Sequence, residues 1–452
     1  MSLCYNQGKY REKMETKAKI EIISRKAINP FSPTSPQCRN LKFSLLDQIV
    51  PPRYTSIILF YTANTNQNID SSSTAHSEIS NSLQKSLSKT LVHFYPFAGR
   101  LKDNTCIECS DEGAYFIEAR INCQLSEFIK EPDPNFLSHL LPTSDPKGAE
   151  LVGRVVLLIQ LTVFKCGGTA VSVCASHKIA DASSMCEFIK SWAAMARDHD
   201  EVVHPEFIGA SMMRPTTDPS IEGRLEAPGE SFVTKRFVFD VSKLANLKAK
   251  IGSGVPQLVP TNVELVSAIF LRCAIAACQS TTGCLKPSLL YQTVNLRTRM
   301  VPPVPEAAIG NLIWGFPVVV EEASKMEVGD IVVKMRKGLI DFCNEKANRF
   351  KGEDGYSFVF ESFKVGESLK MGMNMYFCSS WCKFPFYEVD FGWGKPTWIT
   401  CPMYSMNAIT LMDTKRGERI EAWVTLEKQE MAMFETNEEL LAFASINPSL
   451  IT

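Results

Sequence analysis

Histidine is scarce in this chain of 452 residues, which has six histidines and none beyond His204. A histidine that acts as a base or binds a metal must therefore come from the first half of the chain. An excess of charge of either sign is also absent, because 48 Lys and Arg face 49 Asp and Glu and the formal net charge is −1. Without a global field, nucleic acid and acidic lipid surfaces are not expected partners. The composition favours a small ligand that is neutral or only locally charged.

Long apolar runs are missing as well. No window approaches the roughly 18 uninterrupted apolar residues that a membrane-spanning helix needs. Residues 1–25 are basic and contain no apolar run, so they do not form a secretory signal. We therefore expect a cytoplasmic protein that does not associate with a membrane. Residues 1–17 are predicted to be a disordered tail, with Met14 as an alternative to Met1 as the physiological start.

Cysteine is frequent, but a cysteine framework is absent. The 15 cysteines are odd in number, and Cys106-x-x-Cys109 has no second cysteine pair or histidine pair at zinc-ligand spacing. This pattern favours reduced, mostly buried thiols, and we predict no metal site. Reduced thiols also fit the cytosol.

Several signatures of known enzyme classes are missing. The Gly-x-Ser-x-Gly sequence of serine hydrolases is absent, and so are the GxGxxG and Walker sequences that bind dinucleotides and nucleoside triphosphates. Asp390-Phe391-Gly392 resembles a kinase element, but no His-Arg-Asp loop or glycine-rich loop accompanies it. We therefore expect no bound cofactor.

The length exceeds one ordinary core, so two domains of about 200 residues each are expected. Residues 203–230, rich in proline and with little periodicity, are the predicted crossover between an N-terminal domain over 18–202 and a C-terminal domain over 231–452. Strands and helices follow one another without strict alternation, which indicates an α/β fold of the α+β, mixed-sheet kind rather than a parallel barrel. The predicted strands are 18–25, 152–165, 169–176, 232–240, 288–296, 311–321, 374–382, 397–402, 407–412 and 419–426, and the predicted helices are 77–92, 182–196, 241–251, 261–278, 326–348 and 428–444.

The segment with the most promising chemistry is His177-Lys178-Ile179-Ala180-Asp181. It lies between a predicted strand and a predicted helix, a junction that can face a cleft. A neutral imidazole suits general base catalysis, for example on an alcohol nucleophile. A His-x-x-x-Asp pattern often arises by chance, however, and on spacing alone a structural histidine is the more frequent alternative. Asp181 is either a catalytic partner or structural, because four residues beyond a strand end need not bring the two side chains into contact.

A second motif, Asp390-Phe391-Gly392-Trp393-Gly394-Lys395-Pro396, changes this interpretation. Two glycines around a tryptophan, followed by a proline, are typical of a tight loop. Together with the His-x-x-x-Asp segment, this loop resembles the paired signature of the BAHD acyl-CoA-dependent acyltransferases of plants. The resemblance spans nearly the whole chain and is greatest to the branch that contains vinorine synthase and the salutaridinol and deacetylvindoline acetyltransferases. Further landmarks stand in family order, namely 94–100, 166–170, 294–297 with 299–300, 310–311 and 379–382.

The resemblance implies two domains, each built like chloramphenicol acetyltransferase, with a channel at their interface. Acyl-CoA would enter from one face and the alcohol from the other. His177 would then be the general base that takes the proton of the acceptor hydroxyl, worth roughly 10²- to 10⁴-fold in rate. The tetrahedral intermediate would expel CoA thiolate without a covalent enzyme intermediate.

The same resemblance implies structural roles for other motif residues. Asp181 would face away from the substrate in a salt bridge to Arg297 and hold the loop that aims His177. The loop with Asp390, Gly392, Trp393 and Gly394 would lie far from the chemistry and help to shape the CoA channel.

Substrate contacts are expected from three further places. Ser379 or Ser380 is the candidate donor to the oxyanion. Lys248 and Lys250 could meet the phosphates of CoA, although a solvated helix face explains them equally well. The acceptor pocket is expected to include Tyr54, Thr55 and Trp381.

We thus expect a monomeric enzyme that transfers an acyl group to a hydroxyl of a plant specialised metabolite. Acetyl-CoA is the expected donor and an alkaloid the expected acceptor. The alternatives are a larger acyl-CoA with a terpenoid or phenolic alcohol, and a catalytically silent relative that binds a ligand.

Overall fold

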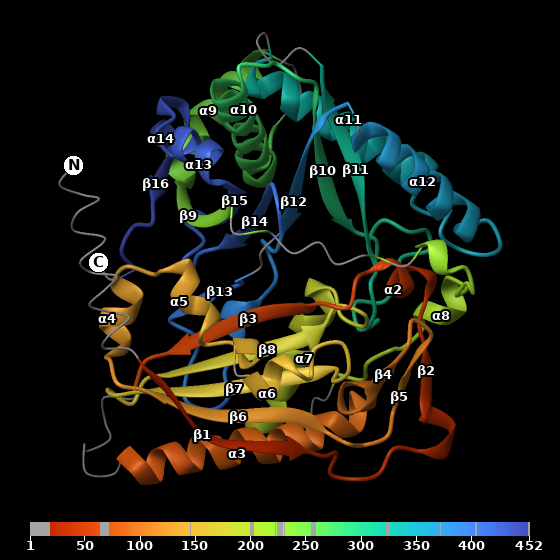
Figure 1. Cartoon of the computed structure of the whole chain (residues 1–452), viewed down its shortest axis with the longest axis vertical. Coiled ribbons are helices and arrows are strands. Elements are labelled where there is room, and N and C mark those ends of the chain that lie inside the picture. The colour runs from red at the N-terminus through yellow and green to blue at the C-terminus, as the bar shows by residue number, and fades with distance from the viewer. Residues whose placement is uncertain are drawn as a thin grey trace.

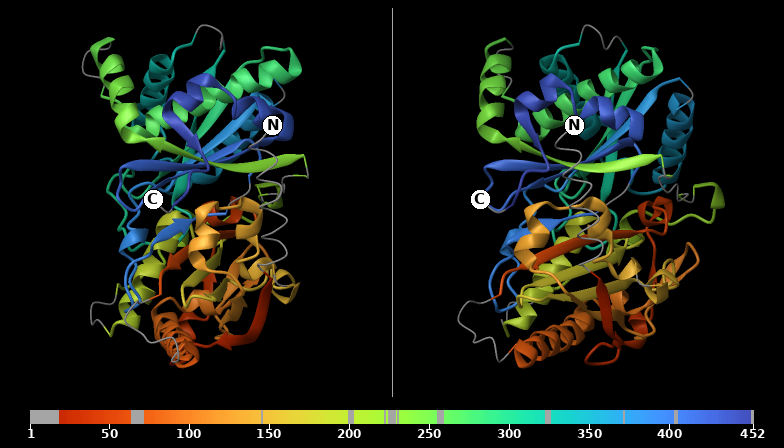
Figure 2. Two further views of the ribbon diagram at one scale, coloured as in Figure 1. Left: turned by 90° about the vertical axis from the view of Figure 1, so that its left-hand side faces the viewer. Right: turned by 60° about the vertical axis from the view of Figure 1, so that its left-hand side comes forward.

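The structure is a computed structural model, and it describes residues 19–63, 72–144, 146–198, 203–221, 223, 229, 231–254, 259–321, 326–370, 372–402 and 405–450. The predicted tail over 1–17 and the alternative start at Met14 lie outside these residues, as do parts of the predicted crossover. Two large sheets lie one above the other in Figures 1 and 2, the first built mainly from the first half of the chain and the second from the second half. The mixed α/β architecture predicted from the sequence is confirmed.

The first sheet has six strands in the order β1-β6-β7-β8-β3-β13. Strands β6 and β7 are parallel, and the other neighbours are antiparallel. Both β7 and β8 are buried along their whole length, as expected for strands rich in apolar and small side chains that are covered on both faces. The strands are β1 (Ile20–Ile28), β3 (Tyr54–Tyr61), β6 (Ala114–Ile121), β7 (Leu157–Phe164), β8 (Thr169–Ser176) and β13 (Trp398–Thr400).

Helices α3 (Ser72–His93) and α7 (Ala182–Ala196) pack on one face of this sheet (Figure 1). Their apolar side chains recur every three or four residues, so each helix directs one stripe into the core. In α7 these are Met185, Phe188, Ile189 and Trp192, and in α3 they are Leu83, Leu87 and Leu91. Strand β8 and helix α7 thus hold the segment 177–181 between two buried elements.

The second sheet has seven strands in the order β11-β10-β12-β14-β15-β9-β16. Its apolar face packs against helices α10, α11, α13 and α14 and forms the largest core of the protein. The strands are β9 (Phe232–Asp240), β10 (Ser288–Asn295), β11 (Ile313–Val320), β12 (Asn374–Ser380), β14 (Ala408–Asp413), β15 (Arg419–Glu427) and β16 (Ala444–Ile446). The helices of this half are α9 (Val241–Gly254), α10 (Asn262–Thr282), α11 (Val328–Glu345), α12 (Gly355–Lys370), α13 (Lys428–Phe434) and α14 (Glu438–Phe443).

Helix α10 begins with a capping box between Thr261 and Glu264 and ends at Gly283, which adopts the left-handed conformation with φ 68°. Among the described residues, it is the one helix long and apolar enough to cross a membrane. Within the fold, 67% of its most apolar window is buried, so its hydrophobicity is accounted for by the core of the second half.

The two halves share a strand. Strand β13, from the second half of the chain, pairs antiparallel with β3 and extends the first sheet (Figure 1). Its Trp398 packs with Trp423 of β15 in a smaller core between the sheets. Both indoles donate hydrogen bonds to the buried carboxylate of Glu421, which also forms an ion pair with Arg236 at 2.7 Å. The domain limits at 202 and 231 stay a prediction, and the first sheet extends beyond them.

Short elements complete the fold. A three-stranded sheet contains β2 (Asn40–Lys42), β4 (Arg100–Lys102) and β5 (Cys106–Glu108), and the short helices are α2 (Leu45–Ile49), α4 (Leu125–Lys130), α5 (Pro134–Ser138), α6 (Pro146–Ala149) and α8 (Gly209–Met212). All cysteines in the described residues are free thiols, most of them buried or partly buried.

Helix α12 was not predicted, and the predicted helix over 428–444 is two helices. The sequence of α12 is rich in aromatic residues and contains Gly366, so its intrinsic preference for a helix is weak. Tertiary contacts stabilise it, because Phe358 packs against Trp314 and Phe350. The break after α13 occurs where the Asn437 side chain caps α14.

Candidate active site

The candidate base His177 directly follows β8, and its position is fixed by its backbone. Its N–H donates to the carbonyl of Arg53, the residue just before β3, over 2.7 Å. The chain then turns until Asp181, whose carboxylate accepts from the N–H of Ser184 at 2.8 Å and caps α7. His177 is 8% exposed, so its imidazole is largely removed from water.

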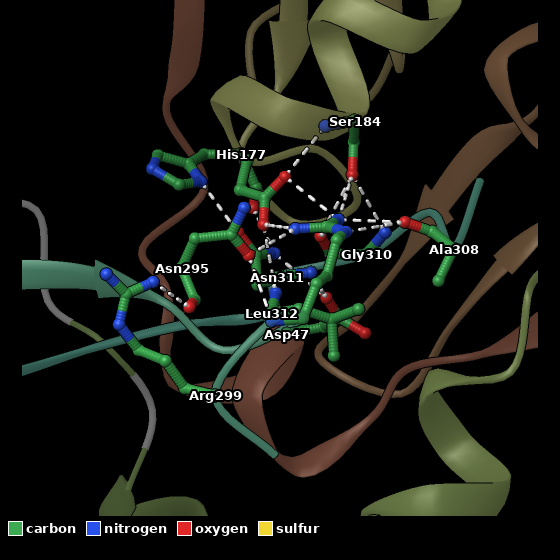
Figure 3. Close-up of polar contacts among 11 residues, drawn as sticks. Asp47, His177, Ser184, Asn295, Arg299, Ala308, Gly310, Asn311 and Leu312 are labelled. Atoms are coloured by element: carbon green, nitrogen blue, oxygen red, sulfur yellow. Dashed lines mark hydrogen bonds and ion pairs between the residues drawn. The ribbon is translucent and has the colours of Figure 1, made fainter. Parts of the chain in front are cut away.

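The side chain of Asn311 determines which nitrogen of His177 carries the proton (Figure 3). Its Nδ2 lies 2.8 Å from Asp47 Oδ1 and 2.6 Å from the carbonyl oxygen of His177. Both neighbours are acceptors, so this end of the amide must be the NH₂ group. The other end, Oδ1, can then only accept, and it lies 2.9 Å from His177 Nδ1. His177 is therefore protonated on Nδ1, which leaves the lone pair of Nε2 available as a base.

Asp47 anchors Asn311 from the opposite side. Its carboxylate accepts from the backbone N–H and the side chain of Asn311, both at 2.8 Å, and from the N–H and hydroxyl of Ser44. Burial raises the pKa of Asp47 above its usual value, and these hydrogen bonds only partly offset that effect. Neither residue was singled out as functional from the sequence. The sequence features that could have indicated them are the Ser-x-x-Asp capping box at residues 44–47 and the family landmark at residues 310–311.

Lys178, next to the base, is buried and faces α2. Its Nζ donates to the carbonyl of Gln48 at 3.0 Å and to Asn104 Oδ1 at 2.5 Å. A lysine at the carbonyl end of a helix is favourably placed for the helix dipole. Lys178 thus ties the turn that carries His177 to α2, which also supplies Asp47.

Asp181 and Arg297 form the ion pair that the family resemblance implies. Arg297 Nη1 lies 2.7 Å from Asp181 Oδ2, and Nη2 lies 3.2 Å from Oδ1. Arg297 also donates to the carbonyl of Ala308, and Asp181 accepts from the N–H of Leu312. Burial acts to raise the pKa of Asp181, but the charge and hydrogen bonds of Arg297 outweigh it and the pKa is lowered. Within the described residues no hydrogen bond joins Asp181 to the imidazole.

The electrostatic environment keeps His177 neutral. Its pKa is lowered to about 4, chiefly because the imidazole is buried and secondly because of the positive charge of Arg53. The hydrogen bond to Asn311 and the charge of Asp181 act in the opposite direction but are smaller. At neutral pH the imidazole is therefore ready to accept a proton.

The predicted oxyanion donors lie at the end of β12, on the second sheet. Both Ser379 and Ser380 are partly exposed, and the hydroxyl of Ser380 accepts from the N–H of Cys382 at 3.3 Å. Trp381 is buried and stacks on Phe386 with ring centroids 5.8 Å apart. No hydrogen bond within the described residues joins these side chains to His177.

The Asp390 loop lies at the other end of α7 from His177. The carboxylate of Asp390 accepts from the N–H groups of Gly392 and Gly394, and both glycines have positive φ, 111° and 108°. Phe391, which follows Asp390, packs edge-on against Trp192, near the end of α7. Because Trp192 stands 11 residues beyond the N-cap Asp181 and a helix rises about 1.5 Å per residue, this loop lies roughly 16 Å from the start of α7. The structural role predicted for Asp390 fits this separation and stays a prediction.

The remaining candidates for substrate contacts, two on β3 and two on α9, lie in different parts of the fold. Tyr54 donates from its hydroxyl to the carbonyl of Val155 at 2.5 Å, and Thr55 is buried with a hydroxyl that has no partner within the described residues. Lys248 is partly exposed and Lys250 exposed on α9, in the helical layer of the second half (Figure 1). A role of these residues in substrate binding stays a prediction.

The hydrogen bond from His177 to Asn311 can be tested by substitution. Asn311→Ala removes the acceptor at Nδ1, so the imidazole can adopt the other tautomer and rotate. We expect kcat to fall about 10- to 100-fold, within the range of a perturbed general base, with little change in KM. Nitrogen NMR of labelled histidine should show the loss of the Nδ1–H tautomer. Asn374→Ala, at the far end of β12, is the control, and an unchanged tautomer in Asn311→Ala would refute the assignment.

Comparison with known proteins agrees with the fold and with the motifs. The sequence matches the Transferase family over residues 18–441. It is 38% identical over 439 residues to akuammiline synthase 1 of Alstonia scholaris, which covers 94% of this chain and 98% of the relative. It is 36% identical over 458 residues to a limonoid 7-O-acetyltransferase of Citrus sinensis, and this alignment covers 95% of this chain and 98% of the relative. The crystal structure of vinorine synthase superimposes with a TM-score of 0.83 at 33% identity, covering 96% of this chain and 100% of that one.

Proposed function

Because the chain belongs to the Transferase family, the BAHD acyl-CoA-dependent O-acyltransferases, we propose that it transfers an acetyl group from acetyl-CoA to a hydroxyl of a plant alkaloid. The enzyme class and the transfer of an acyl group to an alcohol follow from the family. For the finer description we propose a monomer in the cytoplasm that uses acetyl-CoA as a co-substrate and has no bound cofactor.

The mechanism starts with the Nε2 atom of His177. It takes the proton of the acceptor hydroxyl while the oxygen attacks the carbonyl carbon of the thioester. The carbonyl electron pair moves to oxygen and gives a tetrahedral oxyanion. When this intermediate collapses, the carbonyl re-forms and the carbon–sulfur bond breaks. The CoA thiolate then takes the proton from the imidazolium, so the ester and CoA thiol leave and His177 is neutral again.

The observation that carries this proposal is the forced orientation of the Asn311 amide. It leaves Nε2 as the ring nitrogen without a proton, beside the interface of the two halves. Asp181 does not take part in proton transfer in this mechanism, because its carboxylate is occupied by Arg297, Ser184 and Leu312.

Contacts to the substrates are proposed at three places. A hydroxyl of Ser379 or Ser380 donates to the oxyanion, since such donors stabilise charge that develops in the transition state. Lys248 and Lys250 meet phosphates of CoA, and the loop from Asp390 to Gly394 shapes the channel for it. Tyr54, Thr55 and Trp381 contribute to the acceptor pocket.

A terpenoid alcohol is the second candidate for the acceptor. The observation in its favour is the similarity to a limonoid acetyltransferase, which is nearly as high as that to akuammiline synthase 1. The mechanism is the same for both acceptors.

A product panel tests the proposal. Purified protein is incubated with acetyl-CoA, a branched acyl-CoA or an aromatic acyl-CoA, and with a set of alkaloid and terpenoid alcohols. We expect release of free CoA thiol and formation of an ester only when an alcohol is present, with acetyl-CoA as the best donor. Binding of CoA without thiol release for any pair would instead favour a catalytically silent relative.

A further inference from the structure

Arg53 and His177 are neighbours at the adjacent ends of two paired strands, Arg53 just before β3 and His177 just after β8. In the pairing of β3 with β8, Tyr54 lies opposite Ser176, and the bond from the N–H of His177 to the carbonyl of Arg53 at 2.7 Å continues this register by one residue. Residues directly opposite in an antiparallel pair project to the same face, with Cβ atoms about 5 Å apart. The side chains of Arg53 and His177 therefore stand next to each other.

No carboxylate among the described residues forms an ion pair with Arg53. Within the described residues its guanidinium makes one hydrogen bond, from Nη1 to the hydroxyl of Ser405 at 3.1 Å, and no ion pair. The two buried carboxylates near this site are both engaged elsewhere, Asp47 by Asn311 and Asp181 by Arg297. A guanidinium has five N–H donors, so Arg53 can still offer a planar pair of donors to a ligand.

Thr55 provides a second polar group on the same side. It lies two residues after Arg53, and alternate residues of a strand project to the same face. The residue is 1% exposed, and its hydroxyl has no hydrogen-bond partner within the described residues. An unpaired polar atom in a buried position is costly unless a ligand satisfies it.

A cation beside the base also has a chemical cost. Arg53 is the second largest cause of the low pKa of His177, after burial. A general base works best when its pKa is close to the working pH, so Arg53 alone weakens it. A bound anion at the guanidinium would offset this charge and raise the basicity of His177 when the substrate is in place.

We propose that Arg53 and Thr55 form a subsite for a carboxylate that one of the two substrates carries next to the reacting hydroxyl or acyl group. The inference rests on the proposed acyl transfer and narrows its substrate class. With acetyl-CoA as donor, the carboxylate belongs to the acceptor, which is then a hydroxy acid. The other source of the same chemistry is a dicarboxylic acyl-CoA.

Binding measurements separate these sources without any need for turnover. In the acceptor arm, isothermal titration calorimetry compares 4-(hydroxymethyl)benzoate with its methyl ester. In the donor arm, it compares malonyl-CoA with acetyl-CoA. Each titration uses the full chain as wild type, Arg53→Met, Arg53→Lys, Thr55→Val and Arg349→Met. Arg349 lies beyond α11 and contacts Phe358, so its substitution removes one positive charge away from the site.

We expect the wild type to bind the charged member of one pair about 10- to 100-fold more tightly, the strength of one or two hydrogen bonds to a charged group. Arg53→Met should abolish this preference and leave binding of the neutral member within about threefold. Arg53→Lys should retain part of the preference, Thr55→Val should reduce it, and Arg349→Met should leave it unchanged. A preference in the acceptor pair identifies a hydroxy acid, and a preference in the donor pair identifies a dicarboxylic acyl-CoA.

Two results would overturn the subsite. In the first, the wild type binds the charged and neutral members of both pairs equally well. In the second, Arg53→Met weakens binding of the neutral member as much as binding of the charged member. The second result would mean that Arg53 stabilises the oxyanion or positions His177. Thermal unfolding of each variant shows whether a loss of binding is due to misfolding. If Arg53→Met misfolds, the binding preference of Arg53→Lys tests the subsite instead. Failure of the acyl-transfer proposal would be recognised separately, as the absence of thiol release in the product panel.

Discussion

Replacing His177 by alanine should lower kcat about 10²- to 10⁴-fold, the contribution expected of a positioned general base. Alanine removes Nε2, the nitrogen that Asn311 leaves free to accept the hydroxyl proton. The measurement is the rate of CoA thiol release with an acceptor identified in the product panel. His139→Ala is the matched control, because His139 is an exposed histidine of the same half and should keep full activity.

The substitution should leave the fold intact, because one hydrogen bond from the side chain is lost and the backbone bond to Arg53 remains. His177→Gln retains a polar side chain of similar size and should be as inactive as alanine, since an amide is not a base at neutral pH. Activity within about threefold of the wild type in either variant would mean that another group takes the proton.

Arg297→Met should lower the free energy of unfolding by about 3–5 kcal/mol, the cost of removing one partner of a buried ion pair. Both side chains of the pair are 1% exposed, so the charge of Asp181 would remain buried without compensation. Urea unfolding of the variant against the wild type gives the difference. Arg299→Met is the control, because Arg299 is two residues away and, among the described residues, donates only to neutral oxygens, the carbonyl of Asn295 and the hydroxyl of Thr298.

Replacing both partners should cost less than replacing one. In Asp181→Leu combined with Arg297→Met neither charge remains buried, so most of the loss should be recovered. The pKa of Asp181 lies below its usual value of 3.8 in the folded protein. The pair therefore contributes stability above the unfolded pKa, and this contribution is lost as the pH falls through the folded pKa. If Arg297→Met costs no more than Arg299→Met, the ion pair does not hold the turn after His177.

Local signals explain what could be predicted from the sequence. The bounds of β8, α7 and β9 agree with the predicted segments, because alternation marks the two strands and the helical spacing of apolar residues marks α7. The position of His177 between a strand and a helix follows from the first two. The family resemblance identified Arg297 as the partner of Asp181, whereas spacing alone left the role of Asp181 undecided.

Contacts between distant residues explain what could not. His177 and Asn311 are 134 residues apart, and Asp47 comes from a third segment, so no pattern in one window indicates their hydrogen bonds. Arg53 was missed for a similar reason, since β3 itself was not predicted and its pairing with β8 places the cation beside the base. Packing against Trp314 likewise outweighs the weak helical preference of α12.

Strand β13, which the second half contributes to the first sheet, also determines when the first sheet can be completed during synthesis. During synthesis, β3 is an open edge strand until residues 398–400 have left the ribosome. An open edge with unpaired backbone groups invites pairing with another chain. More than 330 residues separate the two strands, and contacts of such long sequence separation form slowly. The catalytic half therefore depends on the second half for protection against aggregation as well as for the Asn311 amide that orients its base.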